Sequence, residues 1–295
     1  MKDSWKRPRT LSQRLRAFKA FSLVRRARAA RMARVLGEAL GRASLDWVTP
    51  PFCRECGSSL REASPLGLFN SCFCVDCRAG VEWLEGACPR CAAPGGLART
   101  VVVPRSATTG AAAEPPRCDA CVDRDYAFDS VAAAARYSGP TRTAILRFKF
   151  HGDRGLLSLL VAVLGQTGRA LQDRGVGLDC REVAVVPVPQ HPWKRLLRGA
   201  DPVDELARRF ARELALPFVS ALRKVRHTRT QVQLPRSARE RNLRRAFVTR
   251  QRVVLPRTII LVDDVLTTGT TASQCAVVLK KAGAAAVHVV AVARS

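Results

Sequence analysis

Residues 258–271 read Thr-Ile-Ile-Leu-Val-Asp-Asp-Val-Leu-Thr-Thr-Gly-Thr-Thr, and this order of residue types predicts a strand, a loop and a helix in succession. The unbroken apolar run from Ile259 to Val262 is typical of a strand that is buried on both faces of a parallel sheet. The carboxylates of Asp263 and Asp264 follow directly. A loop of small residues comes next, and the apolar residues after it recur at helical spacing.

The segment after this strand has the composition of a site for a phosphorylated sugar. The backbone amides of the loop and the dipole of the following helix favour an anion there, and Gly269 permits a positive φ and a close approach of the backbone. The two carboxylates can accept hydrogen bonds from ribose hydroxyls or hold Mg²⁺ through water. A strand-to-helix turn without a ligand is the alternative, but it would not require paired carboxylates beside five small residues.

The same segment resembles the 5-phosphoribosyl-1-pyrophosphate (PRPP) motif of type I phosphoribosyltransferases, in which Asp-Asp and Thr-Thr-Gly-Thr follow a hydrophobic run. The resemblance implies a parallel α/β sheet and a site for PRPP with Mg²⁺. It implies a catalytic role at the ribose for Asp263 and Asp264. The residues that it implies as PRPP-binding in this segment are Thr267, Thr268, Gly269, Thr270 and Thr271.

The composition is that of a globular, strongly basic protein. The chain has 295 residues, which suffices for one large or two modest domains, and 47% of them are hydrophobic. Its formal charge is +26, and the excess is concentrated at residues 1–42, with 13 basic and 2 acidic residues, and at residues 194–257, with 18 and 5. Such charge favours a polyanionic partner, either nucleic acid or the phosphates of a ligand, although arginine-rich proteins also carry ordinary basic surfaces.

The sequence also bounds the compartment. No apolar run approaches the length of a membrane span, and the N-terminus lacks the continuous apolar region of a secretory signal. Eight of the 11 cysteines form Cys-x-x-Cys pairs, which favours metal binding over disulfides. We therefore expect a protein without a transmembrane segment in the reducing cytoplasm.

Residues 1–49 predict a basic amphipathic or partly disordered extension. Apolar residues between Leu11 and Leu40 recur at helical spacing, with arginines between them. Such a helix could lie on a membrane surface or along nucleic acid. It could equally pack against the rest of the chain, so the sequence assigns no specific function to this segment.

Residues 50–125 predict a double zinc ribbon. Two Cys-x-x-Cys pairs supply the four thiolates of a closed, structural zinc site, and each zinc ion would contribute on the order of 10 kcal/mol to folding. The first two pairs are separated by 17 residues and the last two by 26, because of an insert at residues 100–116 that reads as a loop. The predicted ligands of the two zinc ions are Cys53, Cys56, Cys74, Cys77, Cys88, Cys91, Cys118 and Cys121.

Three alternatives remain open for these cysteines. The pairs could interleave in a cross-braced arrangement instead of following one another. Cys72 lies two residues before Cys74 and could compete as a ligand. A dithiol exchange function is the third, but it would need a thioredoxin-like context that this sequence lacks.

Residues 126–295 predict the α/β domain. We expect strands at residues 128–137, 183–188 and 287–292, the last beside the strand of the PRPP motif. We expect helices at residues 141–150, capped by Thr141, and at 156–171, and a third helix that is capped by Asp201 and begins at Pro202. Residues 223–245 are dense in charge and lack apolar periodicity, which predicts a mobile loop over the site.

A second part of the candidate site follows the strand at residues 183–188. Ligands in open α/β sheets bind at the carboxyl ends of the strands, and prolines at this end stop strand pairing. Basic residues downstream are well placed to meet a pyrophosphate. The candidate PRPP-binding residues here are Pro189, Gln190, Lys194 and Arg195.

Over residues 50–295 the chain resembles the ComF family, whose members join a double zinc ribbon to a phosphoribosyltransferase-like domain. The resemblance is carried by the four cysteine pairs, Phe148-Lys149-Phe150-His151-Gly152-Asp153, Val186-Pro187-Val188-Pro189, Arg239-Glu240-Arg241-Asn242-Leu243 and the PRPP motif. It implies PRPP-type ligand binding and a pyrophosphate loop near residues 187–191. Members of known role act in natural competence, where they handle incoming single-stranded DNA in the cytoplasm with a helicase-like partner.

One segment departs from the family pattern. Family members usually show Arg-Gly-Phe-Asn-Gln where this chain has Arg198-Gly199-Ala200-Asp201-Pro202, which removes an aromatic ring and two amides from the pyrophosphate side. Our first hypothesis is a DNA-uptake accessory protein that binds Mg-PRPP. The second is an active phosphoribosyltransferase that transfers ribose 5-phosphate to a nitrogenous acceptor, and the third is a module that senses PRPP without turnover.

Overall fold

The computed structural model describes residues 52–60, 72–96, 100–101, 117–190, 201–225, 246–251 and 253–295. The predicted extension at residues 1–49 lies outside these ranges, as do Lys194, Arg195 and most of the charged segment at 223–245. Residues Phe52–Ser295 belong to one compact unit. No helix within the described ranges is both long enough and apolar enough to cross a bilayer.

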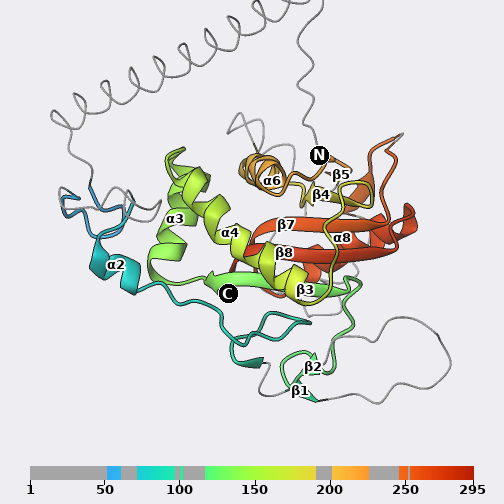
Figure 1. The fold of residues 1–295 in the computed structure, drawn as a ribbon, viewed down its shortest axis with the longest axis horizontal. Coiled ribbons are helices and arrows are strands. Elements are labelled where there is room, and N and C mark those ends of the chain that lie inside the picture. The colour runs from blue at the N-terminus through green and yellow to red at the C-terminus, as the bar shows by residue number, and fades with distance from the viewer. Residues whose placement is uncertain are drawn as a thin grey trace, which may run out of the picture. The chain divides into compact units, whose positions relative to one another are not determined.

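A parallel sheet forms the centre of the described residues, with strands in the order β3-β8-β7-β4 (Figure 1). The strands are β3 Ser130–Arg136, β4 Val183–Pro187, β7 Thr258–Leu266 and β8 Ala286–Arg294. The predicted α/β class is therefore confirmed, and the last strand does lie beside the motif strand. β7 is longer than predicted because β8 pairs with it as far as Leu266, opposite Arg294.

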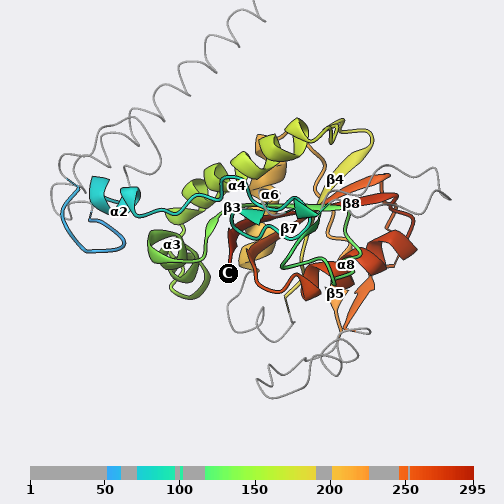
Figure 2. The same ribbon diagram turned by 90° about the horizontal axis from the view of Figure 1, so that it is seen from below.

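Helices cover both faces of this sheet (Figure 2). One face packs against α3 (Gly139–Phe150), α4 (Leu156–Asp173) and α6 (Pro202–Glu213). The other face packs against α8 (Thr270–Lys281) and a small antiparallel pair, β5 (Leu222–Lys224) and β6 (Phe247–Thr249). The prediction of a mobile loop over residues 223–245 is thus wrong for residues 223 and 224, which belong to β5 and pair with β6.

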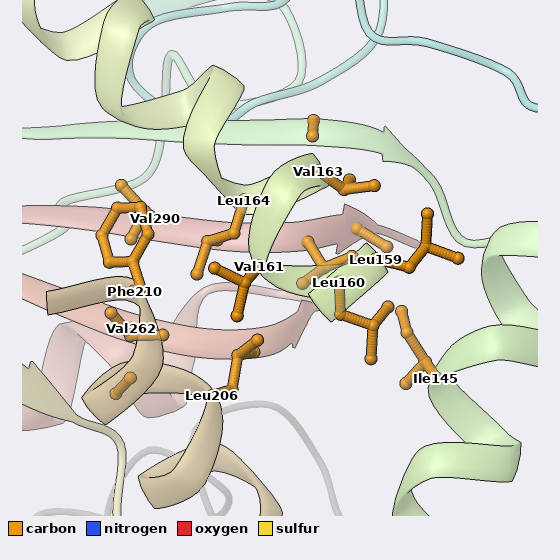
Figure 3. Packing of buried hydrophobic residues seen from close by; sticks show 14 of the residues in the cluster. Ile145, Leu159, Leu160, Val161, Val163, Leu164, Leu206, Phe210, Val262 and Val290 are labelled. Atoms are coloured by element: carbon orange, nitrogen blue, oxygen red, sulfur yellow. The ribbon is translucent and has the colours of Figure 1, made fainter. Parts of the chain in front are cut away.

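The apolar run of β7 divides its side chains between the two faces. Val262 packs against α4 and α6 (Figure 3), and Ile260 belongs to the same buried cluster. Ile259 and Leu261 pack on the face that carries α8. All four are fully buried. Since each such side chain contributes about 1.5–3 kcal/mol on burial, the run specifies a central strand with helices on both sides.

Two helix starts test the capping predictions. Asp201 caps α6 as predicted, because its carboxylate accepts from Val203 N at 3.0 Å and from Asp204 N at 3.4 Å. The predicted cap at Thr141 is wrong, since α3 begins at Gly139 and its N-cap is Ser138. Gly-Pro reads as a turn, but proline is also well tolerated in the first turn of a helix, where its missing N–H has no helical partner.

Residues 82–89, which lead from the first cysteine cluster into the second, cover the outer edge of β3. Backbone hydrogen bonds join Leu84 N to Ala134 O at 2.9 Å and Arg136 N to Glu82 O at 2.8 Å. A further bond joins Val131 N to Pro89 O at 2.9 Å. An exposed edge strand can pair with a strand of another chain. The backbone hydrogen bonds from the cysteine-rich region occupy this edge of β3 and prevent such pairing. The other elements of this region are α2 (Val75–Ala79), β1 (Thr100–Val101) and β2 (Arg117–Cys118).

Candidate functional site

The candidate site lies at the carboxyl ends of β4 and β7, which are neighbours in the sheet. Pro187 pairs with Val262, and Val188 N donates to Val262 O at 2.8 Å. The residues that follow, Pro189 and Gln190 on one strand and the Asp pair on the other, therefore emerge side by side. The fold thus brings the described residues of the two predicted parts of the site to one edge of the sheet; Lys194 and Arg195 lie outside the described residues.

The two carboxylates have different surroundings. The Asp264 side chain is 11% exposed and forms an ion pair with Lys149 of α3. Asp263 keeps an intermediate exposure as a residue, and it accepts a hydrogen bond from Asp264 N at 2.9 Å. Its close surroundings raise the pKa of the Asp263 carboxyl to about 8, chiefly by burial and then by the Asp264 charge, while Lys149 opposes the rise.

Lys149 is the site residue that sequence reasoning did not assign. It lies in the last turn of α3, directly after the buried Phe148, and its side chain is 21% exposed. The sequence did contain a signal for it, because Lys149 lies in the motif at residues 148–153 that supports the family resemblance. That resemblance gave the lysine no role. Its ammonium group brings a positive charge to the carboxylates at the strand ends.

The predicted PRPP loop, Thr267–Thr271, leads from β7 into α8. Gly269 is the N-cap of α8 and has φ +76°, a conformation that favours glycine. The hydroxyls of Thr268 and Thr270 lie 2.8 Å apart, and Thr268 Oγ1 accepts from Thr270 N at 3.4 Å. The loop therefore presents amides and hydroxyls at the N-terminus of a twelve-residue helix, an arrangement suited to an anion.

Asp201 is hydrogen-bonded to Gln190, so it links the residues on either side of residues 191–200. Besides capping α6, its carboxylate accepts a hydrogen bond from Gln190 N at 3.3 Å. Burial raises the pKa of Asp201, although the hydrogen bonds from backbone amides oppose this. Asp201, one of the three residues that depart from the family pattern, therefore joins the start of α6 to Gln190, which follows β4.

The cysteines form two groups of four that follow one another along the chain. Cys53, Cys56, Cys74 and Cys77 form the first cluster, and Cys88, Cys91, Cys118 and Cys121 form the second, with the sulfur atoms of each cluster within 4.8 Å of one another. The four pairs are thus grouped sequentially and not interleaved.

The sulfur spacing fits a tetrahedral metal. The Sγ atoms lie 3.7 Å apart for Cys56 and Cys74, and 3.5 Å apart for Cys91 and Cys118. A zinc ion with Zn–S bonds of about 2.3 Å requires its ligands to lie about 3.8 Å apart, whereas a disulfide requires about 2.05 Å. Each cluster could therefore hold one zinc ion. Cys72 belongs to neither group, and its side chain is buried in the apolar cluster that includes residues of α3 and α4.

Comparison with known proteins agrees with this geometry. A family model for the phosphoribosyl transferase domain matches residues 197–295. Competence protein F of Haemophilus influenzae is 31% identical over 185 residues, which cover 60% of this chain and 78% of the relative. The chain belongs to the ComF family.

Other relatives match a larger share of this ComF protein. DNA utilization protein YhgH is 29% identical in Salmonella typhimurium, over 76% of this chain and 91% of the relative. The Escherichia coli protein of the same name is also 29% identical over the same shares. Among solved structures, orotate phosphoribosyltransferase from Aeropyrum pernix is 18% identical, covers 53% of this chain and 78% of its own, and has a TM-score of 0.30.

Proposed function

We propose that this ComF protein binds PRPP with Mg²⁺ at the carboxyl edge of its sheet and handles single-stranded DNA in the cytoplasm as an accessory of DNA uptake. One observation carries the proposal. The Asp263–Asp264 pair, Lys149 and the loop at the N-terminus of α8 lie together at the carboxyl ends of the neighbouring strands β4 and β7. Each group matches one part of a phosphoribosyl ligand.

The ligand's three parts meet different residues in this proposal. The 5-phosphate lies on the amides and hydroxyls of the PRPP loop, because the helix N-terminus favours negative charge. The ribose hydroxyls donate hydrogen bonds to Asp263 and Asp264. The pyrophosphate lies beside Pro189 and Gln190, with Lys194 and Arg195 as further contacts from outside the described residues. Bound Mg²⁺ neutralises part of the pyrophosphate charge.

Lys149 keeps the site ready for this ligand. The charge of Asp264 raises the pKa of the adjacent Asp263 carboxyl, because like charges at a partly buried position repel each other. The Lys149 ammonium opposes the rise at Asp263 and pairs with Asp264. The ion pair therefore holds the Asp264 carboxylate as an acceptor for a ribose hydroxyl.

Single-stranded DNA is the second ligand in the proposal. The names of the relatives refer to competence and to DNA utilization, and residues 194–257 carry 18 basic against 5 acidic residues. Phosphate contacts from lysine and arginine bind nucleic acid without sequence preference. A helicase-like partner would pass the strand to this protein or receive it.

Thermal unfolding with and without Mg-PRPP tests the ligand site. At a hundredfold excess over Kd, ligand binding stabilises the folded state by about 2.7 kcal/mol. We expect this gain in the zinc-loaded parent and in Asp173→Asn, which changes an exposed carboxylate at the end of α4. We expect little gain in Asp264→Asn. An equal gain in Asp264→Asn would place the ligand elsewhere.

Salt dependence tests the DNA function. Neutralising phosphates releases counterions, so the affinity for a fluorescent oligothymidine should fall about tenfold or more between 50 and 200 mM salt. Affinity that does not respond to salt would contradict a phosphate-based interaction. Competition by PRPP in the same assay shows whether the two ligands share a surface.

Turnover is the second candidate function. The acceptor nitrogen would attack C1 of the ribose, and the C1–O bond would break, so that pyrophosphate leaves with the electron pair and the acceptor releases a proton. Asp263 and Asp264 favour this reading, since carboxylates beside the ribose stabilise positive charge that develops at C1. An assay of pyrophosphate release from PRPP with a panel of nucleobases measures this turnover. If no nucleobase causes release, the site binds its ligand without catalysis.

A further inference from the structure

The second cysteine cluster is connected to the PRPP loop by the short segment at residues 122–128. The Tyr126 hydroxyl donates a hydrogen bond to Thr268 O at 3.1 Å. The Tyr126 ring also lies against Gly269, where an added Cβ would come within 3.0 Å of the ring. One side chain that packs against the second cysteine cluster thus contacts both residues that precede α8.

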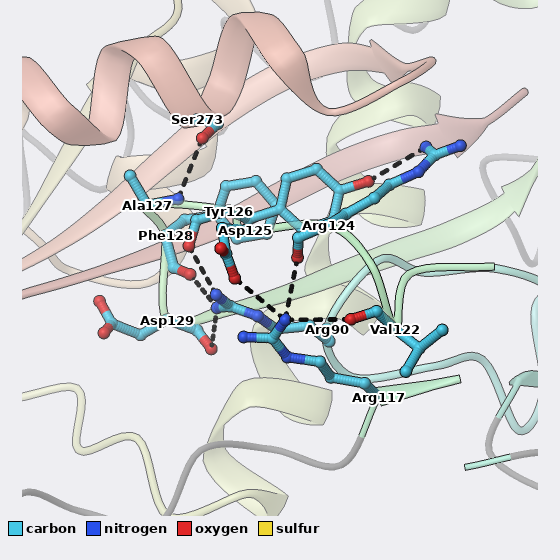
Figure 4. Close-up of polar contacts among 10 residues, drawn as sticks. All are labelled: Arg90, Arg117, Val122, Arg124, Asp125, Tyr126, Ala127, Phe128, Asp129 and Ser273. Carbon is cyan, nitrogen blue, oxygen red and sulfur yellow. Dashed lines mark hydrogen bonds and ion pairs between the residues drawn. The ribbon is translucent and has the colours of Figure 1, made fainter. Parts of the chain in front are cut away.

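The same segment holds the first turn of α8. Ala127 N donates to Ser273 Oγ at 3.0 Å (Figure 4), and the rings of Tyr126 and Phe128 stack with centroids 4.8 Å apart. Ser273 is buried. The loop and the helix that follows it are therefore both fastened to residues 126–128.

The cluster in turn fixes this segment. Arg90 lies between Cys88 and Cys91, is 4% exposed, and donates to Tyr126 O at 2.5 Å and Asp129 O at 3.2 Å, as well as to Phe128 O (Figure 4). On the other side, Arg124 N donates to Cys121 O at 3.0 Å. The backbone that carries Tyr126 is thus held at both ends by residues in or beside the cluster.

A second connection runs through the last strand. Arg294 Nε donates to Cys91 O at 3.1 Å, and Arg294 Nη1 donates to Leu266 O at 3.3 Å. Leu266 directly precedes the PRPP loop. The second cluster therefore reaches both the start and the middle of the loop.

We propose that Tyr126 is a positioning residue that transmits the order of the second cysteine cluster to the anion-binding amides of the PRPP loop. The peptide between Thr268 and Gly269 is planar, so its C=O and N–H point in opposite directions. Fixing Thr268 O on Tyr126 therefore also fixes the direction of Gly269 N–H, and such preorganisation lowers the entropy cost of binding an anion. This inference rests on the proposed function for its ligand but not for the connection itself.

Hydrogen exchange tests the connection without any ligand. We compare the zinc-loaded full chain with Tyr126→Phe, which removes only the hydroxyl, and with Tyr137→Phe, which changes the other tyrosine of the chain. Tyr126→Phe removes the bond to Thr268 O and also the bond that the hydroxyl accepts from Arg124 Nη1 at 3.3 Å. Loss of the bond to Thr268 O should raise the exchange rate of the amides at residues 268–271 about fivefold. Tyr137→Phe should leave it unchanged. Parent-like exchange in Tyr126→Phe overturns the proposal.

The role of the cluster has its own test. Cys118→Ser alters the second cluster, and Cys56→Ser alters the first, whose cysteines lie in the segments at residues 53–56 and 74–77. Faster exchange of the loop in Cys118→Ser and not in Cys56→Ser supports transmission from the second cluster. An unchanged loop in Cys118→Ser refutes it, and Tyr126→Phe remains informative if Cys118→Ser does not fold.

Calorimetry with two probes separates positioning from general damage. Ribose 5-phosphate carries the group that the loop receives, whereas inorganic pyrophosphate does not. Tyr126→Phe should bind ribose 5-phosphate about fivefold more weakly and pyrophosphate as the parent does. Equal affinity of the parent and Tyr126→Phe for ribose 5-phosphate overturns the proposal. A parent that binds neither probe refutes the proposed function instead, and the exchange experiment then decides the connection alone.

Discussion

Lys149 at the end of α3 forms an ion pair with Asp264 near the end of β7, although the two residues are far apart in the sequence. The pair joins a surface helix to the central sheet at the candidate site. It also places a fixed positive charge beside two carboxylates that would otherwise repel each other. Its partial burial makes its loss costly, because the remaining charge keeps little contact with water.

Lys149→Met is expected to lower the free energy of unfolding by about 1–3 kcal/mol, because it leaves the Asp264 carboxylate without its cation. Urea unfolding at neutral pH measures this loss. A double-mutant cycle with Asp264→Asn should give a coupling energy of the same order.

Lys280→Met is the matched control for that prediction. Lys280 pairs with Asp129 at 2.8 Å, but the side chains are 34% and 39% exposed. A pair with such exposure contributes about 1 kcal/mol or less. If both lysine variants lose the same stability, burial is not what makes the Lys149 pair important.

The contribution of Asp263 to the stability of the ligand-free protein should fall as the pH rises from about 4 to about 8. The pKa of Asp263 is raised from 3.8 to about 8 in the folded state, so the folded chain binds more protons than the unfolded chain in this window. The contribution is fully present below the unfolded pKa and is lost as the pH rises through the folded pKa.

Unfolding of the parent and of Asp263→Asn across this window isolates the effect. Asparagine does not titrate, so the difference in unfolding free energy between the two proteins should change with pH in the stated direction. Parallel pH profiles would show that Asp263 is ionised in the folded protein throughout.

The sequence allowed the order of strands and helices to be predicted because the signals are local. The apolar run at Ile259–Val262, the cap at Asp201 and the cysteine spacing each act over a few residues. The contact between Tyr126 and Thr268 joins residues 142 positions apart. It depends on how the cysteine-rich region packs against the sheet, and neither residue type signals it. The same holds for the segment that covers β3, since a backbone pairing leaves no side-chain pattern.

Metal analysis should give two zinc ions per chain, one for each four-cysteine cluster. Cys56→Ser should retain one, because the second cluster is fully buried and has its own four ligands. Structural zinc contributes on the order of 10 kcal/mol per site, so chelation should unfold the cysteine-rich region.

Two cysteines outside the clusters serve as controls for zinc content. Cys180 is exposed, and Cys72 is buried in the apolar core. Cys180→Ser and Cys72→Ala should each keep two zinc ions per chain. A lower zinc content in Cys72→Ala would make Cys72 a ligand after all.

Gly269→Ala should destabilise the protein by at least about 1–2 kcal/mol, since a residue with a Cβ is strained at positive φ. Here φ is +76°, and the new methyl group would meet the Tyr126 ring.

Gly165→Ala is the control, and it should change the stability in the opposite direction. Gly165 lies inside α4 and has open space where the methyl group of alanine would lie, so alanine should stabilise by about 0.5–1 kcal/mol. Thermal unfolding of both variants distinguishes strain at the loop from a general effect of alanine.

Asp201→Ala should cost about 1–2 kcal/mol, because it removes the cap of α6 and the acceptor for Gln190 N. Asp201→Asn should stay within about 0.5 kcal/mol of the parent, since an amide oxygen can still accept these bonds. Burial raises the pKa of Asp201, which indicates that the charge itself is not stabilising there.

Asp204→Ala is the control, because it breaks the exposed ion pair with Arg208 on the same helix. It should lower the free energy of unfolding less than Asp201→Ala does. If Asp201→Asn were as damaging as Asp201→Ala, the carboxylate charge and not its hydrogen bonds would be what this site requires.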